Sequence, residues 1–211
     1  MTKSDPLDDW LSTQPTKVHR RSKPLMNVVR EAYPIGVPAM IVKSQTDRLG
    51  ESGGYAFHLG TPDDVLRRIC SWLLTHGEEE VLLELVHGLW KRHGREDIAL
   101  AALILANLQT VGNVWIHLGD VIGRTSTAEA LLLSIEECLR AKHPPPGEEL
   151  LIDWCKRSIA HSHLALLLCH AVWIRAKRPP LSPNLTEQFN SIEYPDGDSL
   201  LVRVRDQMLN S

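Results

Sequence analysis

Three consecutive segments decide the fold of this 211-residue chain: TPDDVLRRICSWLLTHG (residues 61–77), EEEVLLELVHGLWKRHG (78–94) and REDIALAALILANL (95–108). Apolar residues recur in each at intervals of three and four, which predicts α-helices. Thr61 is placed to cap the first helix, and a glycine ends each of the first two segments. The third segment is almost entirely Ala, Leu and Ile after its first turn, so we expect its helix to be buried on most sides.

Helical periodicity continues to the end of the chain. The further expected helices cover residues 25–32, 113–122, 126–142, 148–173 and 198–209, with a loop rich in Pro, Asn and Asp before the last of them. The remainder of the first sixty residues is broken by Pro and Gly. No alternating strand pattern occurs, so the sequence predicts an all-α protein. We expect an N-terminal helix or two with a long connecting loop at 1–60, and a helical domain at 61–211.

Short connections between apolar helices favour antiparallel helix pairs stacked side by side, as in a HEAT-like helical-repeat solenoid. A weak internal echo supports this interpretation: LWKR at residues 89–92 is followed by an apolar helix, as is WCKR at residues 154–157. A compact helical bundle is the alternative architecture.

The composition argues against several classes of protein. The chain carries 23 Lys and Arg against 26 Asp and Glu, a net charge of −3, whereas proteins that bind nucleic acid through bulk charge are more basic. It has no run of about 18 apolar residues and no apolar secretion signal at its start. We therefore expect a cytoplasmic protein with no membrane partner, and a monomer.

Cysteine and histidine spacing gives no support for a metal or a cofactor. The four cysteines are Cys70, Cys138, Cys155 and Cys169. All lie in apolar helical patterns without a C-x-x-C pair, so we expect reduced, buried thiols. His163 and His170 would lie about 10 Å apart along one helix, too far to share an ion. We predict no metal site and no cofactor.

Trp115 differs from most other tryptophans in its sequence surroundings. Those at apolar helical positions, which we expect in the core, are Trp72, Trp90, Trp154 and Trp173. Trp115 instead lies near the start of a short helix among polar residues and glycines, with the carboxylate of Asp120 soon after it. A ligand surface is one interpretation of this pattern, and a buried Trp with a solvated Asp is the other.

Basic residues follow two of the tryptophans and end the long helical segment. Residues 142–180 carry six Lys or Arg against three Asp or Glu. Such a face could neutralise a few phosphates, and ordinary solvated helix ends are the alternative. The candidate DNA-binding residues are Lys91, Arg92, Arg124, Lys156, Arg157, Arg175 and Lys177.

Four short motifs, taken in order, resemble the DNA alkylation repair family of AlkD-like glycosylases, which are built from HEAT-like repeats. They are LGTPDDVLRRI (residues 59–69), LWKRHGREDIA (89–99), NVWIHLGD (113–120) and IDWCKRSI (152–159). The similar region runs from Gly60 to Ala171.

The resemblance implies hydrolysis of the N-glycosidic bond of N3- or N7-alkylated purines in duplex DNA. Asp120 would stabilise the developing oxocarbenium ion and position a water, Trp115 would face the cationic base, and Arg157 would hold a backbone phosphate. In that family the Trp and Asp lie four residues apart, whereas Trp115 and Asp120 are five apart, or about 140° around a helix. The late Trp of the family also has no counterpart in residues 201–205. A non-catalytic helical-repeat module that binds DNA or a protein partner is the alternative function.

Overall fold

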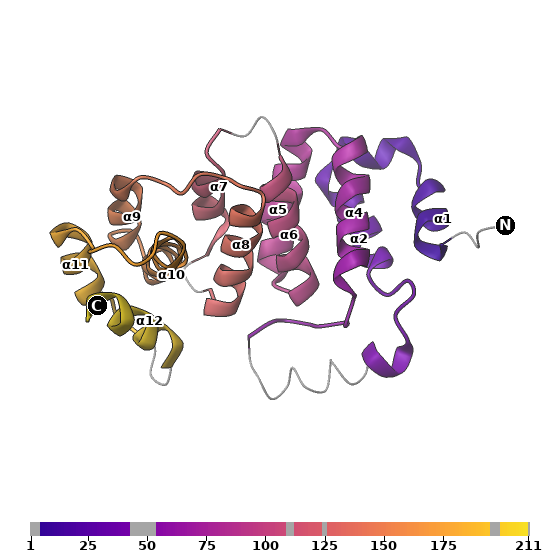
Figure 1. Ribbon diagram of the computed structural model, residues 1–211. Helices are drawn as coiled ribbons and strands as arrows, with labels where there is room; N and C mark the ends of the chain where they lie inside the picture. The colour runs from indigo at the N-terminus through magenta and orange to yellow at the C-terminus, as the bar shows by residue number, and fades with distance from the viewer. Residues whose placement is uncertain (1–4, 43–53, 109–111, 124–125, 195–198, 211) are drawn as a thin grey trace. The chain divides into compact units, whose positions relative to one another are not determined.

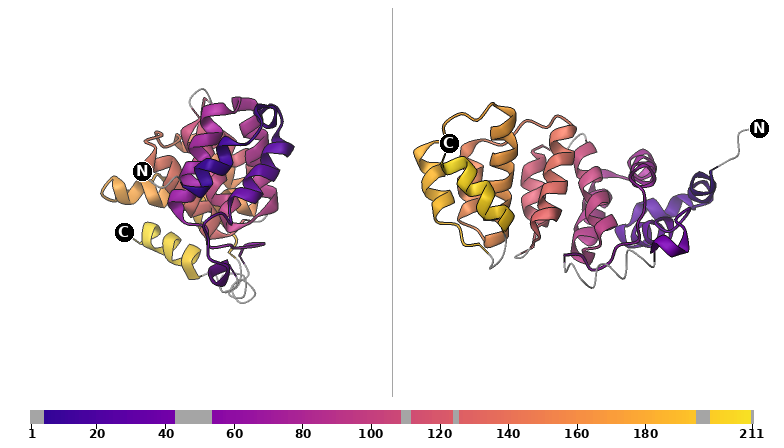
Figure 2. Two further views of the ribbon diagram at one scale, coloured as in Figure 1. Left: turned by 90° about the vertical axis from the view of Figure 1, so that its right-hand side faces the viewer. Right: turned by 60° about the horizontal axis from the view of Figure 1, so that its bottom comes forward.

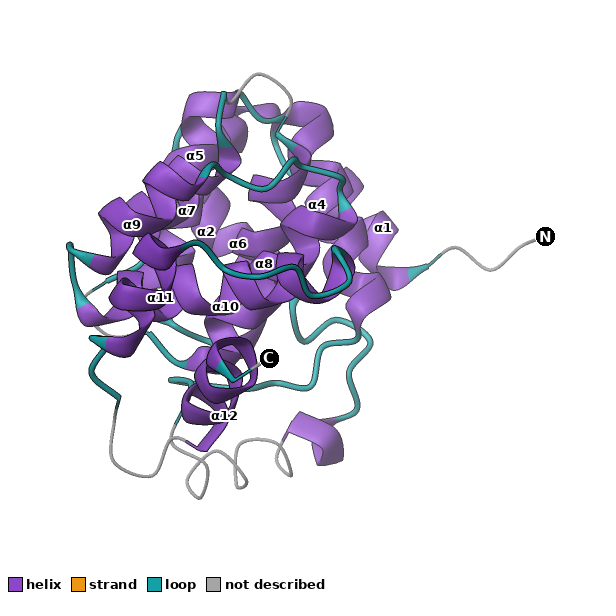
Figure 3. Ribbon diagram, turned by 60° about the vertical axis from the view of Figure 1, so that its left-hand side comes forward, coloured by secondary structure: helices purple, strands orange, loops and turns teal. Residues whose placement is uncertain are grey.

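The computed structural model describes residues 5–42, 54–108, 112–123, 126–194 and 199–210. In these ranges all regular structure is helical and no strand occurs, which confirms the all-α prediction (Figures 1 and 3). No helix within them is long and apolar enough to span a membrane. The chain divides into two compact units, Met1–Gly112 and Asn113–Ser211. The boundary expected after residue 60 lies within the first of these units.

The three helices expected from residue 61 to residue 108 are all present in the first unit. Its described helical segments are α1 (Pro6–Ser12), the 3-10 helix η1 (Thr16–Arg20), α2 (Ser22–Ala32), α4 (Asp63–His76), α5 (Glu79–Arg92) and α6 (Arg95–Asn107). α6 packs against α4 and α5, and every residue from Glu96 to Ala106 is buried. The expectation that this helix is buried on most sides is therefore confirmed.

The start of α4 differs from the prediction. The sequence favours Thr61 as its N-cap, but Pro62 occupies that position and provides no side-chain cap. The Thr61 hydroxyl instead donates a hydrogen bond to the carbonyl oxygen of Tyr33, 3.0 Å away. The Thr61 side chain therefore bonds to the residue that follows α2, far away in the sequence, and does not cap α4.

The carboxylate of Glu96 joins residues 59–61 to the first turn of α6. Its Oε1 accepts hydrogen bonds from the backbone N–H groups of Leu59, Gly60 and Thr61 at 2.9, 3.0 and 3.3 Å. The Glu96 side chain is fully buried. Gly60 has a φ of 76°, in the left-handed region that glycine adopts at little cost, and this turn lets three successive amides converge on one oxygen. The carboxylate therefore fixes the chain immediately before α4.

Asp97, the next residue of α6, connects Tyr33 and Arg92 to the first turn of the same helix. Its Oδ1 accepts a hydrogen bond from the Tyr33 hydroxyl at 2.9 Å, and its Oδ2 lies 3.4 Å from Nε of Arg92. Burial raises the pKa of Asp97 to about 6, against the opposing effects of Arg92 and Tyr33. The Arg92 guanidinium also lies over the ring of Phe57, 5.0 Å from its centroid. The contacts of the two buried carboxylates, Glu96 and Asp97, thus meet at the first turn of α6.

The second unit is built around α10. Its described helices are α7 (Val114–Val121), α8 (Ala128–Arg140), α9 (Glu148–Cys155), α10 (Ile159–Arg175), α11 (Pro183–Asn190) and α12 (Ser199–Leu209). α10 packs against α8, α9 and α12, and Figure 2 shows these orange to yellow helices side by side. The residues from Leu164 to Leu168 are completely buried. Asn113 and Thr127 cap α7 and α8 with their side chains, as their positions predict.

Two helix boundaries correct the sequence analysis. The apolar pattern over residues 148–173 predicts one helix, but the chain forms α9 and α10 because Ser158 adopts an extended conformation, with a φ of −159°, and caps α10. The segment after Pro180 was expected to be a loop, yet it contains α11. Ser182 caps α11 and Pro183 occupies its first turn, a start signal that the prolines around it concealed.

The four cysteines form no disulfide, and three of them, Cys70, Cys138 and Cys169, are buried. Burial raises the pKa of the Cys138 and Cys169 thiols to about 12, and that of the half-buried Cys155 to about 11. The expected burial is confirmed for Cys70, Cys138 and Cys169, whereas Cys155 is only half-buried.

Replacing Glu96 with alanine should remove the shared acceptor of three backbone N–H groups. Because an unsatisfied buried donor costs about 1–3 kcal/mol, we expect the free energy of unfolding to fall by roughly 3 kcal/mol or more in urea denaturation. Glu96→Gln keeps an acceptor oxygen and should lose less. Glu80→Ala removes an exposed carboxylate from the first turn of α5 and should change stability by no more than about 0.5 kcal/mol. Native stability in Glu96→Ala would contradict this role.

Candidate functional site

The end of α7 and the start of α10 meet at His161 in the second unit, within electrostatic range of two predicted site residues, Asp120 and Arg157. Nε2 of His161 lies 3.0 Å from the carbonyl oxygen of Gly119, so the imidazole ring lies beside the residue that precedes Asp120. Asp120 and Arg157 are both close enough to interact electrostatically with His161. Both side chains are exposed. Together with their neighbours they form the His161 cluster: Asp120, Asp153, Arg157, Ser158 and His161.

The two ring nitrogens of His161 have different partners, which assigns its tautomer. A carbonyl oxygen can only accept, so Nε2 donates its proton to Gly119. Nδ1 then accepts a hydrogen bond from the Ser158 hydroxyl at 2.7 Å, and that hydroxyl oxygen in turn caps the backbone N–H of His161. Burial lowers the pKa of His161, and Arg157 lowers it further against the raising effects of Gly119, Asp120 and Asp153. The cluster therefore holds a neutral imidazole.

Arg157 lies next to the N-terminus of α10, a 17-residue helix. Its Nη2 and Nε are 2.6 and 2.8 Å from Oδ2 of Asp153, one turn earlier on α9. Lys156 beside it is exposed. Two cations and a helix N-terminus make this end of the unit favourable to an anion, while Asp153 is the competing carboxylate that an anion would have to displace.

Trp115 is part of the core of the second unit. Its side chain is only 1% exposed, and its indole N–H donates to the carbonyl oxygen of Pro144 at 2.7 Å. α7 continues as a helix through Gly119, so residues five apart point in different directions, and Trp115 faces inward while Asp120 faces solvent. Gly119 itself lies against Trp154, where an added Cβ would be 3.0 Å from Nε1. The ring of Trp115 thus presents no face to a ligand beside Asp120.

The remaining predicted cations of the second unit do not gather at the His161 cluster. Arg175 pairs with Glu136 at 3.0 Å, and Lys177 is exposed, both at the far end of α10. Seventeen residues of helix place them roughly 25 Å from Arg157 along the axis. In the first unit, Lys91 is exposed and Arg92 is occupied by Asp97 and Phe57. Arg124 lies outside the described residues.

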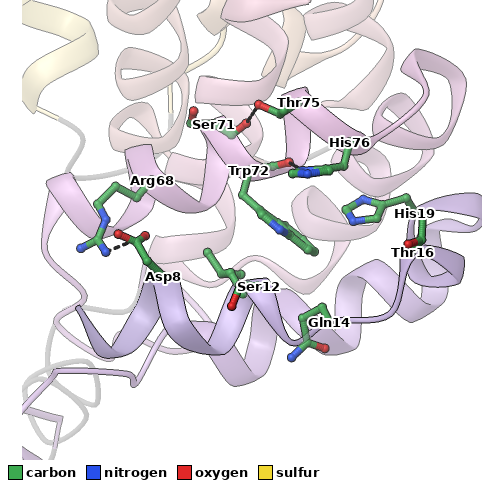
Figure 4. A pocket seen from close by; sticks show the side chains of 11 residues that line it. Asp8, Ser12, Gln14, Thr16, His19, Arg68, Ser71, Trp72, Thr75 and His76 are labelled. Atoms are coloured by element: carbon green, nitrogen blue, oxygen red, sulfur yellow. Dashed lines mark hydrogen bonds and ion pairs between the residues drawn. The ribbon is translucent and has the colours of Figure 1, made fainter. Parts of the chain in front are cut away.

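A second candidate site, which the sequence analysis missed, is an open cleft of about 610 Å³ in the first unit between α1, η1 and α4. Figure 4 shows its lining, in which the rings of His19, Trp72 and His76 lie against one another. The centroid of His19 is 4.4 Å from that of Trp72 and 5.2 Å from that of His76. Trp72 is half-buried on this wall, whereas Trp90, Trp154 and Trp173 are in the core as expected. The sequence signal was the spacing of four residues between Trp72 and His76 on one helix face.

Neither site has the composition of a metal centre. Within the described ranges, no three His, Cys, Asp or Glu side chains are grouped so that they could hold an ion. Comparison with protein-family models, curated proteins and solved structures gives no match.

Replacing His161 with alanine should cost about 1–2 kcal/mol of stability at about pH 8, because Gly119 and Ser158 lose their hydrogen-bond partner. The pKa of His161 is lowered in the folded state, so its contribution is present above the unfolded pKa of about 6.5 and is lost as the pH falls. Urea unfolding between about pH 5 and 8 should show a weaker pH dependence in His161→Ala than in the native protein.

The control for this experiment is His117→Ala, which removes a half-exposed histidine of α7. It should keep the pH dependence of the native protein. An unchanged pH dependence in His161→Ala would show that the folded state does not favour the neutral form of this ring.

Proposed function

We propose that the chain is a HEAT-like helical-repeat protein that binds duplex DNA and hydrolyses the N-glycosidic bond of N3- or N7-alkylated purines. One observation carries the proposal: the exposed carboxylate of Asp120 shares the His161 cluster with Arg157, although 37 residues separate them in sequence. The resemblance to AlkD-like glycosylases independently assigns these two residues to the reacting sugar and the adjacent phosphate.

Hydrolysis of this glycosidic bond needs little more from the protein than a carboxylate close to C1′ of the sugar. An alkylated purine is cationic, so it leaves as a neutral base with the electron pair of its bond to C1′. The sugar then carries positive charge, which the Asp120 carboxylate would stabilise by Coulomb attraction. The same carboxylate would accept a proton from the water that attacks C1′.

The N-terminus of α10 supplies the phosphate contact in this proposal. Arg157 and Lys156 precede the helix, and the first-turn amides of α10 add a partial positive charge. Binding requires Arg157 to exchange Asp153 for a phosphate oxygen. Such an exchange is accessible because the ion pair is exposed, with side-chain accessibilities of 44% and 52%.

A second candidate function is non-catalytic binding of duplex DNA, and the burial of Trp115 favours it. Without that ring, Asp120 lacks the aromatic partner that would stabilise a cationic base, an interaction worth about 1–2 kcal/mol when desolvated. The phosphate contact of α10 does not depend on Trp115. DNA binding could therefore persist in a chain that has no glycosylase activity.

Release of methylated purine from alkylated duplex DNA tests the first candidate. We expect release by the native protein and a loss of roughly 100-fold in Asp120→Asn, because the amide cannot accept the proton or stabilise the cation. Glu129→Gln, which changes another exposed carboxylate of the second unit, should keep native activity. Absence of release by the native protein would reject the glycosylase and leave the binding module.

Salt-dependent binding of unmodified duplex tests the second candidate. If Lys156 and Arg157 each contact a phosphate, replacing either with alanine should lower the slope of log affinity against log salt by about 1. Lys177→Ala, at the far end of α10, should leave the slope unchanged. A native protein that binds no duplex at low salt would reject both DNA functions and indicate a protein partner.

A further inference from the structure

The cleft of the first unit, between α1, η1 and α4, belongs to neither proposed DNA function. Its volume of about 610 Å³ falls within the range of small-molecule sites. The half-buried indole of Trp72 forms part of its wall beside two further lining rings, His19 at 4.4 Å and His76 at 5.8 Å between ring centroids. A planar ligand could therefore stack against an aromatic surface that neighbouring rings hold in place (Figure 4).

Several polar groups at this cleft already donate their protons in hydrogen bonds to backbone carbonyl oxygens. The Ser12 hydroxyl donates to the carbonyl oxygen of Asp9, and the Thr75 hydroxyl donates to that of Ser71, both at 2.7 Å. Nδ1 of His76 lies 2.8 Å from the carbonyl oxygen of Trp72, so Nδ1 donates and Nε2 is left as an acceptor in the neutral ring. What these side chains can still offer a ligand is lone pairs, which suits a ligand rich in N–H donors.

The charges around the cleft favour a cation. Arg68 lies 2.8 Å from a carboxylate oxygen of Asp5 and 2.7 Å from one of Asp8, so two carboxylates share one guanidinium. The summed charge of this trio is −1, and both Asp8 and Arg68 line the cleft. Burial lowers the pKa of His19, so the His19 ring is neutral at neutral pH and does not repel a cation.

We propose that this cleft binds a guanidinium group, whose planar face stacks on Trp72 while its N–H groups donate to the carboxylate of Asp8 and the hydroxyl oxygen of Ser12. A guanidinium is planar, carries five N–H donors and stacks on aromatic rings, so it meets each requirement of the lining. A lysine ammonium has the charge but not the flat face. The ligand is either a free arginine-like molecule or an arginine side chain of a peptide.

Calorimetric titration with N-acetyl-arginine amide tests the site, and N-acetyl-citrulline amide is the matched ligand because it keeps the planar shape without the charge. We expect the arginine compound to bind at least tenfold more tightly. A Gly-Arg-Gly peptide separates the two sources: tighter binding than the amino-acid amide indicates a peptide ligand, and weaker binding indicates a free small molecule.

Two variants locate the binding site. Trp72→Leu removes the stacking face and Asp8→Asn removes the lining carboxylate, and each should weaken binding of N-acetyl-arginine amide roughly tenfold. Trp10→Leu and Asp9→Asn, which change neighbouring residues of α1 that do not line the cleft, should bind as the native protein does. Circular dichroism checks that each variant retains its helices, and Asp8→Asn keeps the test decisive if Trp72→Leu fails to fold.

Three results would overturn the proposal. They are no binding of the arginine compound by the native protein up to about 10 mM, equal affinity for the citrulline compound, and native affinity in both Asp8→Asn and a folded Trp72→Leu. None of these outcomes bears on DNA binding or base release, which the second unit alone is proposed to carry.

Discussion

A single buried carboxylate organises the first unit. Glu96 gathers three backbone amides onto one oxygen at the first turn of α6, and so determines where the chain leaves residues 59–61 and enters α4. α4 carries Arg68, Trp72 and His76, and the cleft exists because these side chains face α1 and η1. A buried acid is costly unless it accepts hydrogen bonds, and three backbone amides supply them to one oxygen of Glu96. The position of the cleft therefore depends on a polar contact made on another helix.

The apolar periodicity of the sequence predicts most of the helices, because amphipathic order is a local property of the chain. It places α4, α5 and α6 closely and identifies α6 as central. It fails where a polar contact interrupts an apolar pattern. Ser158 divides what looks like one helix, and its hydroxyl meets His161, so the break is set by side-chain hydrogen bonds that periodicity does not register.

The site residues were predictable to different degrees for a related reason. Motif order brought Asp120 and Arg157 together as candidates, and both lie at the His161 cluster. The same reasoning could not decide the environment of Trp115, because whether an indole packs inward depends on a carbonyl group 29 residues away, at Pro144. Two walls of the cleft could not be predicted, since α1 and η1 come from the least regular part of the sequence, whereas the third wall, α4, was expected. Trp72 looked like core because its partner His19 lies in a 3-10 helix without apolar periodicity.

Each unit contains a buried thiol whose reaction with a thiol reagent reports the unfolding of that unit. A thiol with a pKa near 11 or 12 forms almost no thiolate at neutral pH, and thiol reagents attack the thiolate. The thiols that are also buried, those of Cys70, Cys138 and Cys169, must therefore be exposed by local or global unfolding before they react. Cys70 lies in the first unit, whereas Cys138, Cys155 and Cys169 lie in the second. Labelling followed residue by residue in the unmodified protein would show whether the two units unfold together or one at a time.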